Sequence, residues 1–157
     1  MAVIRVEHGP FQVQDEIAAL TSGRTDIGGI GLFMGTVRGS ANGRELRSMT
    51  LEHYPGMTER ALAGLASAAE QRWPLQGCVI IHRVGELLPG DPIVLVAAAS
   101  THRQAALDAT AFLIDWLKTR APFWKKEAFT DGTSKWVDAR ESDDSAAARW
   151  GVMPEPV

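Results

Sequence analysis

Basic and aromatic side chains gather in the segment 115–127, which reads DWLKTRAPFWKKE. Four lysine or arginine residues and three aromatic rings flank a single proline there. The chain as a whole is acidic, with a formal net charge of -3. A basic, aromatic cluster in an acidic protein indicates a local site for an anion with a flat ring, and not a general surface for polyanions.

Lys118 and Lys125 stand out in this segment because they belong to two different predicted elements. A helix should end before Pro122, since the residue ahead of a proline is pushed out of the helical region, and Lys118 then lies in its last turn. Residues 123–129 alternate as a strand that points Lys125 and Glu127 to the same side. If the two lysines face one pocket, each lowers the pKa of the other. A lysine that titrates nearer neutrality can act as a general acid and base.

Other interpretations of the same residues stay open. A cation in a last helical turn can simply offset the negative helix end, and Asp115, one turn back, can pair with the helical lysine and keep it charged. Lys126 points away from Lys125, so both cannot face one pocket unless the strand is bulged. Trp116 and Trp124 are expected in the core, where such rings are most often found.

Anion binding is also indicated at two places elsewhere in the chain. Thr101 with Gln104 fits a capping box, so a helix should start there, with His102 and Arg103 in its first turn. Free backbone N–H groups and the positive end of the helix dipole favour anions at such a turn, and an arginine adds a two-pronged phosphate donor. Arg38 ends a predicted glycine-rich strand beside a loop, which suits a phosphate clamp. A surface turn with incidental charge is the alternative.

The remaining pattern mixes hairpins with helices. Strands are expected over residues 2–7, 28–38, 45–53, 79–84, 93–99, 123–129 and 135–137, and helices over residues 13–20, from an N-cap at Thr58 to Pro74, and from Thr101 to Pro122. Asn42-Gly43 predicts a hairpin turn. Gly31 and Gly35 share one strand face, where a glycine lets a backbone or a ligand come close. This order favours an α+β fold over a doubly wound sheet.

Length and composition restrict the function further. The 157 residues predict a single domain over residues 1–150 and a loose C-terminal tail over 151–157. The negative net charge argues against nucleic acid as a partner. The longest apolar run, residues 93–99, is too short to cross a bilayer, and the N-terminus does not read as a signal peptide, so a cytoplasmic protein is expected.

Cysteine and histidine usage predicts neither a disulfide nor a metal site. Cys78 is the single cysteine, lies in an apolar run and is expected to be a buried small hydrophobe. The four histidines are scattered, and no Cys/His or His/Glu pair has metal-ligand spacing. No glycine-rich nucleotide-binding motif is present in the sequence. Neither a metal nor a cofactor is therefore expected.

Several runs of the sequence resemble the catalytic (large) subunit of molybdopterin synthase. They are LEHYPGMTE at 51–59, HRVGEL at 82–87, PGD at 89–91, HR at 102–103, LKTRAPFWKKE at 117–127 and ARESD at 139–143. Together they cover most of residues 28–150, and the run around Lys118 is long and unusual. The resemblance is therefore specific.

The resemblance implies a fold, a reaction and partners. The fold is an α/β hammerhead with an additional antiparallel β subdomain. The reaction is sulfur transfer from the C-terminal Gly-Gly thiocarboxylate of a small ubiquitin-like subunit to cyclic pyranopterin monophosphate (precursor Z), which forms the dithiolene of molybdopterin in molybdenum cofactor biosynthesis. The family forms a homodimer with one small subunit at each end, a heterotetramer. Metal is loaded afterwards, so no metal site or cofactor is implied.

The resemblance also assigns residues by position. Lys118 and Lys125 would be catalytic. Substrate binding would fall to Thr36, Val37, Arg38, His102, Arg103, Lys118, Lys125, Lys126, Glu127 and Arg140, the last reaching from the neighbouring subunit. Gly31 and Gly35 could permit a narrow channel for the Gly-Gly tail.

Three other functions compete with this one. A non-catalytic module that binds a ubiquitin-like tail predicts partner binding without consumption of the precursor. A small RNA- or nucleotide-binding protein predicts steep salt dependence, against which the net charge weighs. A purely structural interpretation leaves the lysines as solvated surface.

Overall fold

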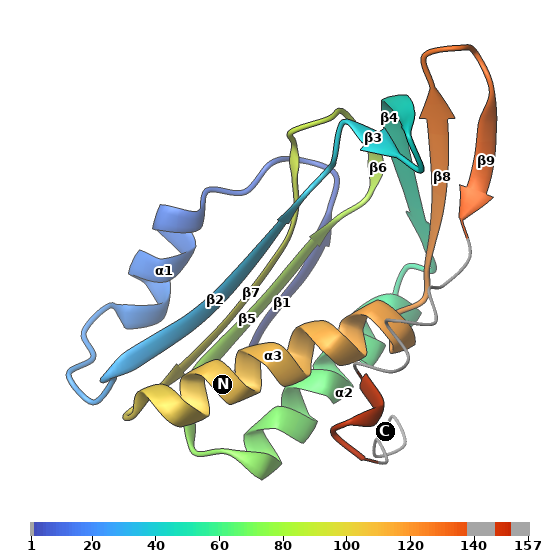
Figure 1. Cartoon of the computed structure of the whole chain (residues 1–157). Helices are drawn as coiled ribbons and strands as arrows, with labels where there is room; N and C mark the ends of the chain where they lie inside the picture. Colours follow the sequence, from blue (N-terminus) through green and yellow to red (C-terminus); the bar gives the residue numbers. More distant parts are fainter. Residues whose placement is uncertain (1, 138–146, 152–157) are drawn as a thin grey trace.

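The first of two sheets forms the body of the molecule (Figure 1). The structure, a computed structural model, describes residues 2–137 and 147–151. The strands follow the order β1 (Ala2–Glu7), β5 (Leu75–Arg83), β7 (Pro92–Ser100) and β2 (Gly29–Thr36). β1 is parallel to β5, and the other neighbours are antiparallel. β5 and β7 are central because their apolar runs are buried along most of their length.

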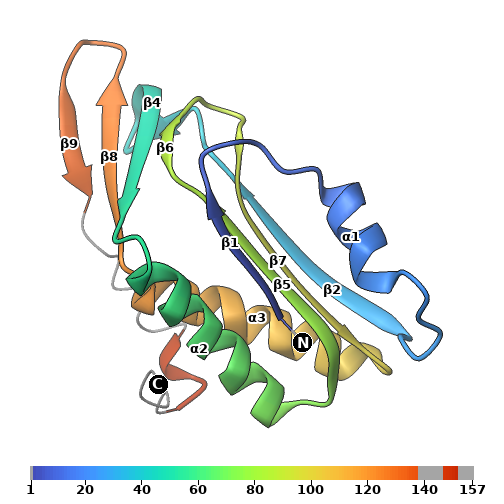
Figure 2. The same cartoon turned by 180° about the vertical axis from the view of Figure 1, so that it is seen from behind.

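Helices cover both faces of this sheet (Figures 1 and 2). On one face, α2 (Met57–Arg72) and α3 (Arg103–Arg120) bury the largest core cluster, which includes Ile80. On the other face, α1 (Val13–Thr21) packs on a second cluster, which includes Ile81. Ile80 and Ile81 fall in different clusters because successive residues of a strand point to opposite faces. The alternation of β5 thus supports a layer of helix on each side.

A second, antiparallel sheet stands at the C-terminal end of α3 (Figure 1). It contains β3 (Ser40–Ala41), β4 (Arg44–His53), β8 (Phe123–Phe129) and β9 (Ser134–Val137), with β6 (Gly85–Leu87) also paired to β4. The turn between β3 and β4 is the predicted one, with φ of 52° at Asn42 and 77° at Gly43. The mixed order of hairpins and helices confirms the α+β class, and the second sheet corresponds to the expected antiparallel subdomain.

The predicted N-cap of α2 is wrong by two residues. The helix begins at Met57, and Gly56 occupies the N-cap with its N–H donating to Glu59 Oε2 at 2.9 Å. Thr58 lies inside the first turn and is fully buried, and its Oγ1 accepts the N–H of Tyr54 at 3.2 Å. A positive φ of 85° suits glycine at the cap, so the glycine and not the threonine starts the helix.

The predicted capping box of α3 is also wrong, although the helix does start there. The N-cap is His102, and it makes no side-chain cap hydrogen bond. Thr101 Oγ1 donates instead to the carbonyl of Asp26 at 3.1 Å, and Gln104 Nε2 donates to Asp108 Oδ2 at 3.0 Å. The threonine is drawn to a neighbouring loop, a tertiary contact that the local pattern does not contain.

Gly31 is required by the packing of α3 on β2. A Cβ at Gly31 would lie 2.4 Å from the carbonyl oxygen of Ala106 and 2.5 Å from Thr110 Oγ1. At Gly35 it would lie 2.8 Å from Val94 Cγ1. The expected close approach is thus confirmed for Gly31 as an approach of helix backbone.

Burial confirms some of the core predictions and contradicts one. Cys78 is fully buried, and burial raises the pKa of its thiol to about 12. Trp116 is half-buried against the main cluster. Trp124 was expected in the core but is 41% exposed, because it points from β8 to the side opposite Lys125 and meets Tyr54 edge-on. Within the described residues, no helix is long and apolar enough to cross a membrane.

Candidate active site

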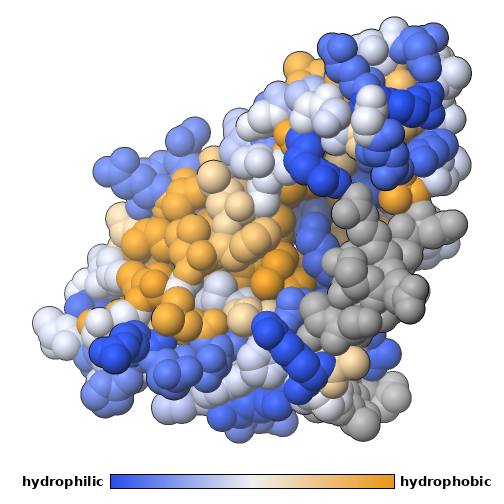
Figure 3. Space-filling model, viewed as in Figure 1, coloured by the Kyte–Doolittle hydropathy of each residue, from blue (hydrophilic) through white to orange (hydrophobic). Residues whose placement is uncertain are grey.

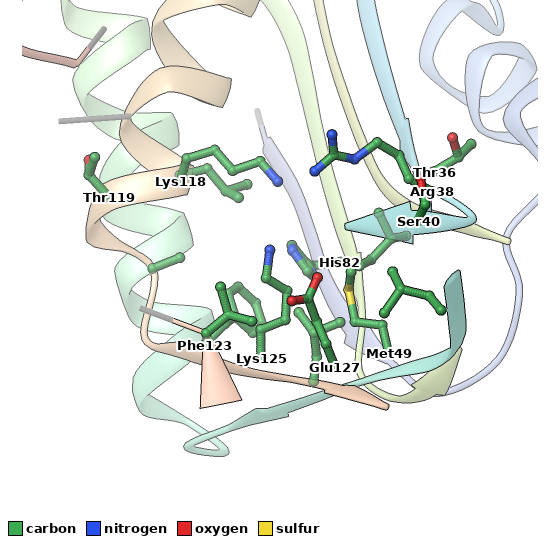
Figure 4. A pocket seen from close by; sticks show the side chains of 16 residues that line it. Thr36, Arg38, Ser40, Met49, His82, Lys118, Thr119, Phe123, Lys125 and Glu127 are labelled. Carbon is green, nitrogen blue, oxygen red and sulfur yellow. The ribbon is translucent and has the colours of Figure 1, made fainter. Parts of the chain in front are cut away.

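A cavity of about 380 Å³ opens where the second sheet meets the end of α3 (Figure 4). Eight apolar side chains and eight polar or charged ones line it: Thr36, Arg38, Ser40, Leu46, Met49, Leu51, His82, Ile93, Leu117, Lys118, Thr119, Ala121, Phe123, Lys125, Glu127 and Val137. Basic groups therefore face apolar walls within one hollow. Such a site suits a small anion that also carries a flat apolar part.

Lys118 and Lys125 enter this cavity from two elements (Figure 4). Lys118 lies in the last turn of α3, and Lys125 is the third residue of β8. Pro122 separates helix from strand and turns the chain back, so that residues seven apart in sequence face the same hollow. Both side chains thus line the cavity that the sequence argument required them to share.

Arg38 and Thr36 reach the cavity from the end of β2 and the residues after it. Between them, Val37 is 3% exposed and belongs to the main core cluster. Its N–H donates to the carbonyl of Asp91 at 2.9 Å, and its carbonyl accepts the N–H of Gly90 at 2.7 Å. These two backbone bonds fix the segment, so that buried Val37 positions its neighbours and does not itself line the cavity in the described structure.

The two sides of β8 separate Glu127 from Lys126, as the strand alternation predicted. Glu127 is buried and lines the cavity on the same side as Lys125. Lys126 points to the other side, and its Nζ lies 5.9 Å from the ring centre of Trp136. A cation over an aromatic face accounts for Lys126 without any role in the cavity.

His82 is a cavity residue that the sequence argument did not assign. It is the eighth residue of β5, it is 3% exposed, and its ring stacks on Phe123 with centroids 3.9 Å apart. Burial lowers the pKa of His82 to about 4, with smaller contributions from the charges of Lys118 and His53. The only sequence signal was a histidine at the end of an apolar strand, within the run HRVGEL.

His102 and Arg103 lie at the opposite end of α3 from Lys118. Fifteen residues separate Arg103 from Lys118, which is about 22 Å along a helix. His102 and Arg103 are both exposed, and neither is among the described residues that line the cavity. Arg140, also expected at the site, lies outside the described residues.

Asp115 is engaged elsewhere in the structure. Its Oδ2 accepts hydrogen bonds from Arg149 Nη2 and from Trp150 Nε1, both at 2.8 Å. The carboxylate thus ties the segment around Trp150 to α3. This arrangement gives Asp115 a structural role next to the cavity.

Metal chemistry has no support in the described part of the chain. No group of three or more His, Cys, Asp or Glu side chains in it is placed to hold a metal ion. The chemistry that the cavity offers is that of its own side chains: cations that bind an anion and lysines that can move protons. Fold and cavity together define a small α+β protein with a pocket lined by basic and apolar side chains.

Comparison with known proteins identifies the family within this class. The family model described as MoaE protein matches residues 6–120. The molybdopterin synthase catalytic subunit of Ralstonia nicotianae is 52% identical over 155 residues, which covers 99% of this chain and 88% of that protein. The chain therefore belongs to the MoaE family, the family of molybdopterin synthase catalytic subunits.

Solved structures agree with this assignment. The molybdopterin biosynthesis MoaE protein from Burkholderia ambifaria has a TM-score of 0.83 and 50% identity, with 97% of this chain and 99% of that chain covered. A complex of subunits 1 and 2 of the molybdopterin-converting factor from Helicobacter pylori has a TM-score of 0.69 at 19% identity, with 87% and 90% covered. The latter likeness concerns the fold alone.

Proposed function

We propose that this chain is the catalytic subunit of a molybdopterin synthase and inserts sulfur into cyclic pyranopterin monophosphate. The sulfur comes from the C-terminal thiocarboxylate of a small ubiquitin-like partner. One observation carries the proposal: in a chain of this family, Lys118 and Lys125 line a single cavity together with Arg38. The Ralstonia nicotianae relative is named a catalytic subunit, which supports an assembly with at least one further subunit.

The cavity suits both parts of the proposed substrate. Arg38 offers a charged donor for the phosphate, and Met49 and Phe123 offer apolar surface for the flat pterin ring. Cys78 cannot donate the sulfur, because its thiol is fully buried and its pKa is about 12. The sulfur must therefore enter from outside, as it does when a thiocarboxylate supplies it.

The proposed reaction assigns a separate task to each lysine. The thiocarboxylate sulfur bonds to a side-chain carbon of the pterin, and the oxygen on that carbon leaves as water with a proton from Lys118. Water then cleaves the partner's acyl–sulfur bond, which leaves sulfur on the pterin and a carboxylate on the partner. Lys125 stabilises the negative charge that develops in these steps.

His102 and Arg103 take part in this proposal only through a second copy of the chain. At about 22 Å from Lys118 along α3, Arg103 is beyond the reach of the cavity in its own chain. A homodimer that brings the N-terminus of α3 to the cavity of its partner would place both residues at the phosphate. The site would then be shared between two subunits.

An exposed apolar surface lies beside that helix end and suits the homodimer contact. Leu32, Phe33 and Met34 of the edge strand β2 are 43%, 37% and 41% exposed. Figure 3 shows the hydrophobic area on this face of the molecule, over β2. Gly29, in the same strand, lies against Arg103: a Cβ there would be 3.4 Å from the Arg103 Cα. A second copy that covers β2 would therefore also contact the start of α3.

Substitution of Lys118 tests the proposed function. With precursor and thiocarboxylated small subunit supplied, Lys118→Ala should lower dithiolene formation by about 10²–10⁴, the usual value of a positioned proton transfer. Arg120→Ala is the matched control, because this substitution also removes one positive charge from the end of α3. Arg120 is exposed and stacks over Trp116, and it does not line the cavity. Near-normal turnover of Lys118→Ala would refute the assignment, and partner binding without any product in the unaltered protein would favour a non-catalytic module.

A further inference from the structure

His82 is one of the side chains that line the cavity, and two contacts orient its ring (Figure 4). One ring face stacks on Phe123, with an interplanar angle of 22°. Its Nδ1 lies 2.8 Å from the carbonyl oxygen of Arg83. With 3% of the residue exposed, the ring has no room to turn without losing both contacts. A buried histidine held this firmly presents one defined atom to the cavity.

The contact with Arg83 determines which atom that is. A carbonyl oxygen can only accept a hydrogen bond, so Nδ1 must carry the proton. The ring is neutral at pH 7, since burial holds the pKa near 4. Nε2 therefore carries a lone pair and acts as a hydrogen-bond acceptor.

Two of the charged groups that share the cavity with the ring, Lys118 and Lys125, can donate a hydrogen bond to that acceptor, whereas the Glu127 carboxylate can only accept one. Lys118 faces the cavity from α3, and Lys125 and Glu127 face it from β8. The ring of His53, in β4, has its centroid 6.5 Å from that of Phe123, and the charges of Lys118 and His53 both lower the pKa of His82. Lys125 follows Phe123 by two residues and so shares its strand face, next to the ring that stacks on His82. An ammonium group is a donor without any acceptor capacity, which makes it complementary to Nε2.

We propose that His82 is a positioning residue of the sulfur-transfer site, whose Nε2 accepts a hydrogen bond from the Lys125 ammonium group and holds it toward the substrate. The inference rests on the proposed function and adds a residue to it. His82 does not touch the reacting atoms in this role. It acts through Lys125, which stabilises the developing charge only if its nitrogen is held in place.

Three variants of His82 separate this role from simple packing. His82→Phe keeps a ring for the stack on Phe123 but has no acceptor, and His82→Asn keeps a polar atom only at the δ position. Both should lower kcat by about 10- to 100-fold, the effect of losing one hydrogen bond to a charged group, with KM for the precursor little changed. His82→Gln can place its amide oxygen near the position of Nε2 and should recover most of the loss. His53→Gln is the control, because His53 does not line the cavity.

A double-mutant cycle tests whether the effect passes through Lys125. In a Lys125→Ala background, His82→Phe should lower kcat by less than about twofold, since the group it positions is already gone. A loss as large as in the unaltered background would overturn the proposal. So would normal turnover of His82→Phe, or a His82→Gln variant as slow as His82→Phe.

Nitrogen NMR provides a test that does not depend on activity or on the folding of a variant. The ¹⁵N spectrum of the unaltered protein should show His82 neutral between pH 5.5 and 8, with the proton on Nδ1. A proton on Nε2, or a charged ring at pH 7, would overturn the proposal. An active Lys118→Ala variant would refute the proposed function, whereas an inactive Lys118→Ala with a normal His82→Phe would refute only the role of His82.

Discussion

Two inactive variants of this chain should restore activity to each other if the site is shared between subunits. The variants are Lys118→Ala, which removes the proposed catalytic lysine, and Arg103→Ala, which removes the proposed phosphate donor at the other end of α3. About 22 Å of helix separates the two residues within one chain. No side chain spans that distance, so a substrate that contacts both must lie between two copies.

The magnitude follows from the symmetry of a dimer. Each variant alone should be at least about tenfold slower, because each loses a charged contact to the substrate in both sites. In a mixed dimer, one site combines the altered Lys118 position with the altered Arg103 position and is inactive. The other combines the two unaltered residues, so a purified mixed dimer should show about half of the wild-type turnover.

Two different affinity tags on co-expressed variants isolate the mixed dimer for the assay. Its turnover is measured with precursor and thiocarboxylated small subunit and compared with that of each parent. A mixed dimer of Lys118→Ala with Lys125→Ala is the control: both residues line the cavity of one chain, so both of its sites remain damaged. Turnover no higher than that of the parents, or a chain that is monomeric under assay conditions, would refute a shared site.

Three further predictions concern stability and reactivity. Gly31→Ala should lower the free energy of unfolding by about 2 kcal/mol, because the new Cβ would lie 2.4 Å from the Ala106 carbonyl oxygen. Gly64→Ala, in the middle of α2 where a Cβ meets no neighbour within 4 Å, should raise it by up to about 1 kcal/mol. Urea titration measures both changes. Cys78 should resist iodoacetamide at pH 8 in the folded protein and react in urea, as mass spectrometry would show, because burial raises its thiol pKa to about 12. As pH falls from about 6.5 to about 4, His82 takes up a proton in the unfolded chain but stays neutral in the folded protein. The free energy of unfolding should therefore fall by about 3 kcal/mol over this range, and His82→Gln should abolish this part of its pH dependence in urea titrations.

The elements followed from local signals wherever those signals were strong. β8 runs over the predicted residues 123–129, and α3 ends before Pro122, because a proline constrains the chain regardless of its surroundings. The caps at Thr58 and Thr101 were wrong for the opposite reason. A threonine hydroxyl has many possible hydrogen-bond partners. In the folded chain, Thr58 accepts the N–H of Tyr54 and Thr101 donates to the carbonyl of Asp26, so neither caps its predicted helix.

Only part of the candidate site could be predicted from the sequence. Lys125 and Glu127 could be placed on one side of β8 because strand alternation is a local rule. The cavity itself arises where the second sheet meets the end of α3, and no local pattern specifies that meeting. His82 illustrates the difference: its role depends on Phe123 and Arg83, of which one is forty-one residues away.

The arrangement of charge in the cavity bears on why the proposed sulfur donor is a separate protein. The chain places lysines and an arginine around the hollow, and its single cysteine is sealed in the core as a neutral thiol. A cationic pocket attracts both an anionic phosphate and an anionic thiocarboxylate, so it can gather the two reactants without a nucleophile of its own. Two anions, the partner's tail and the substrate, can be held side by side only by cations with fixed positions. A mobile ammonium group would pair with the tail or with the substrate, but would not hold the two together. The proposed role of His82 meets that requirement: a neutral ring, oriented by the stack on Phe123 and the contact with the Arg83 carbonyl, would restrain an ammonium group without cancelling its charge.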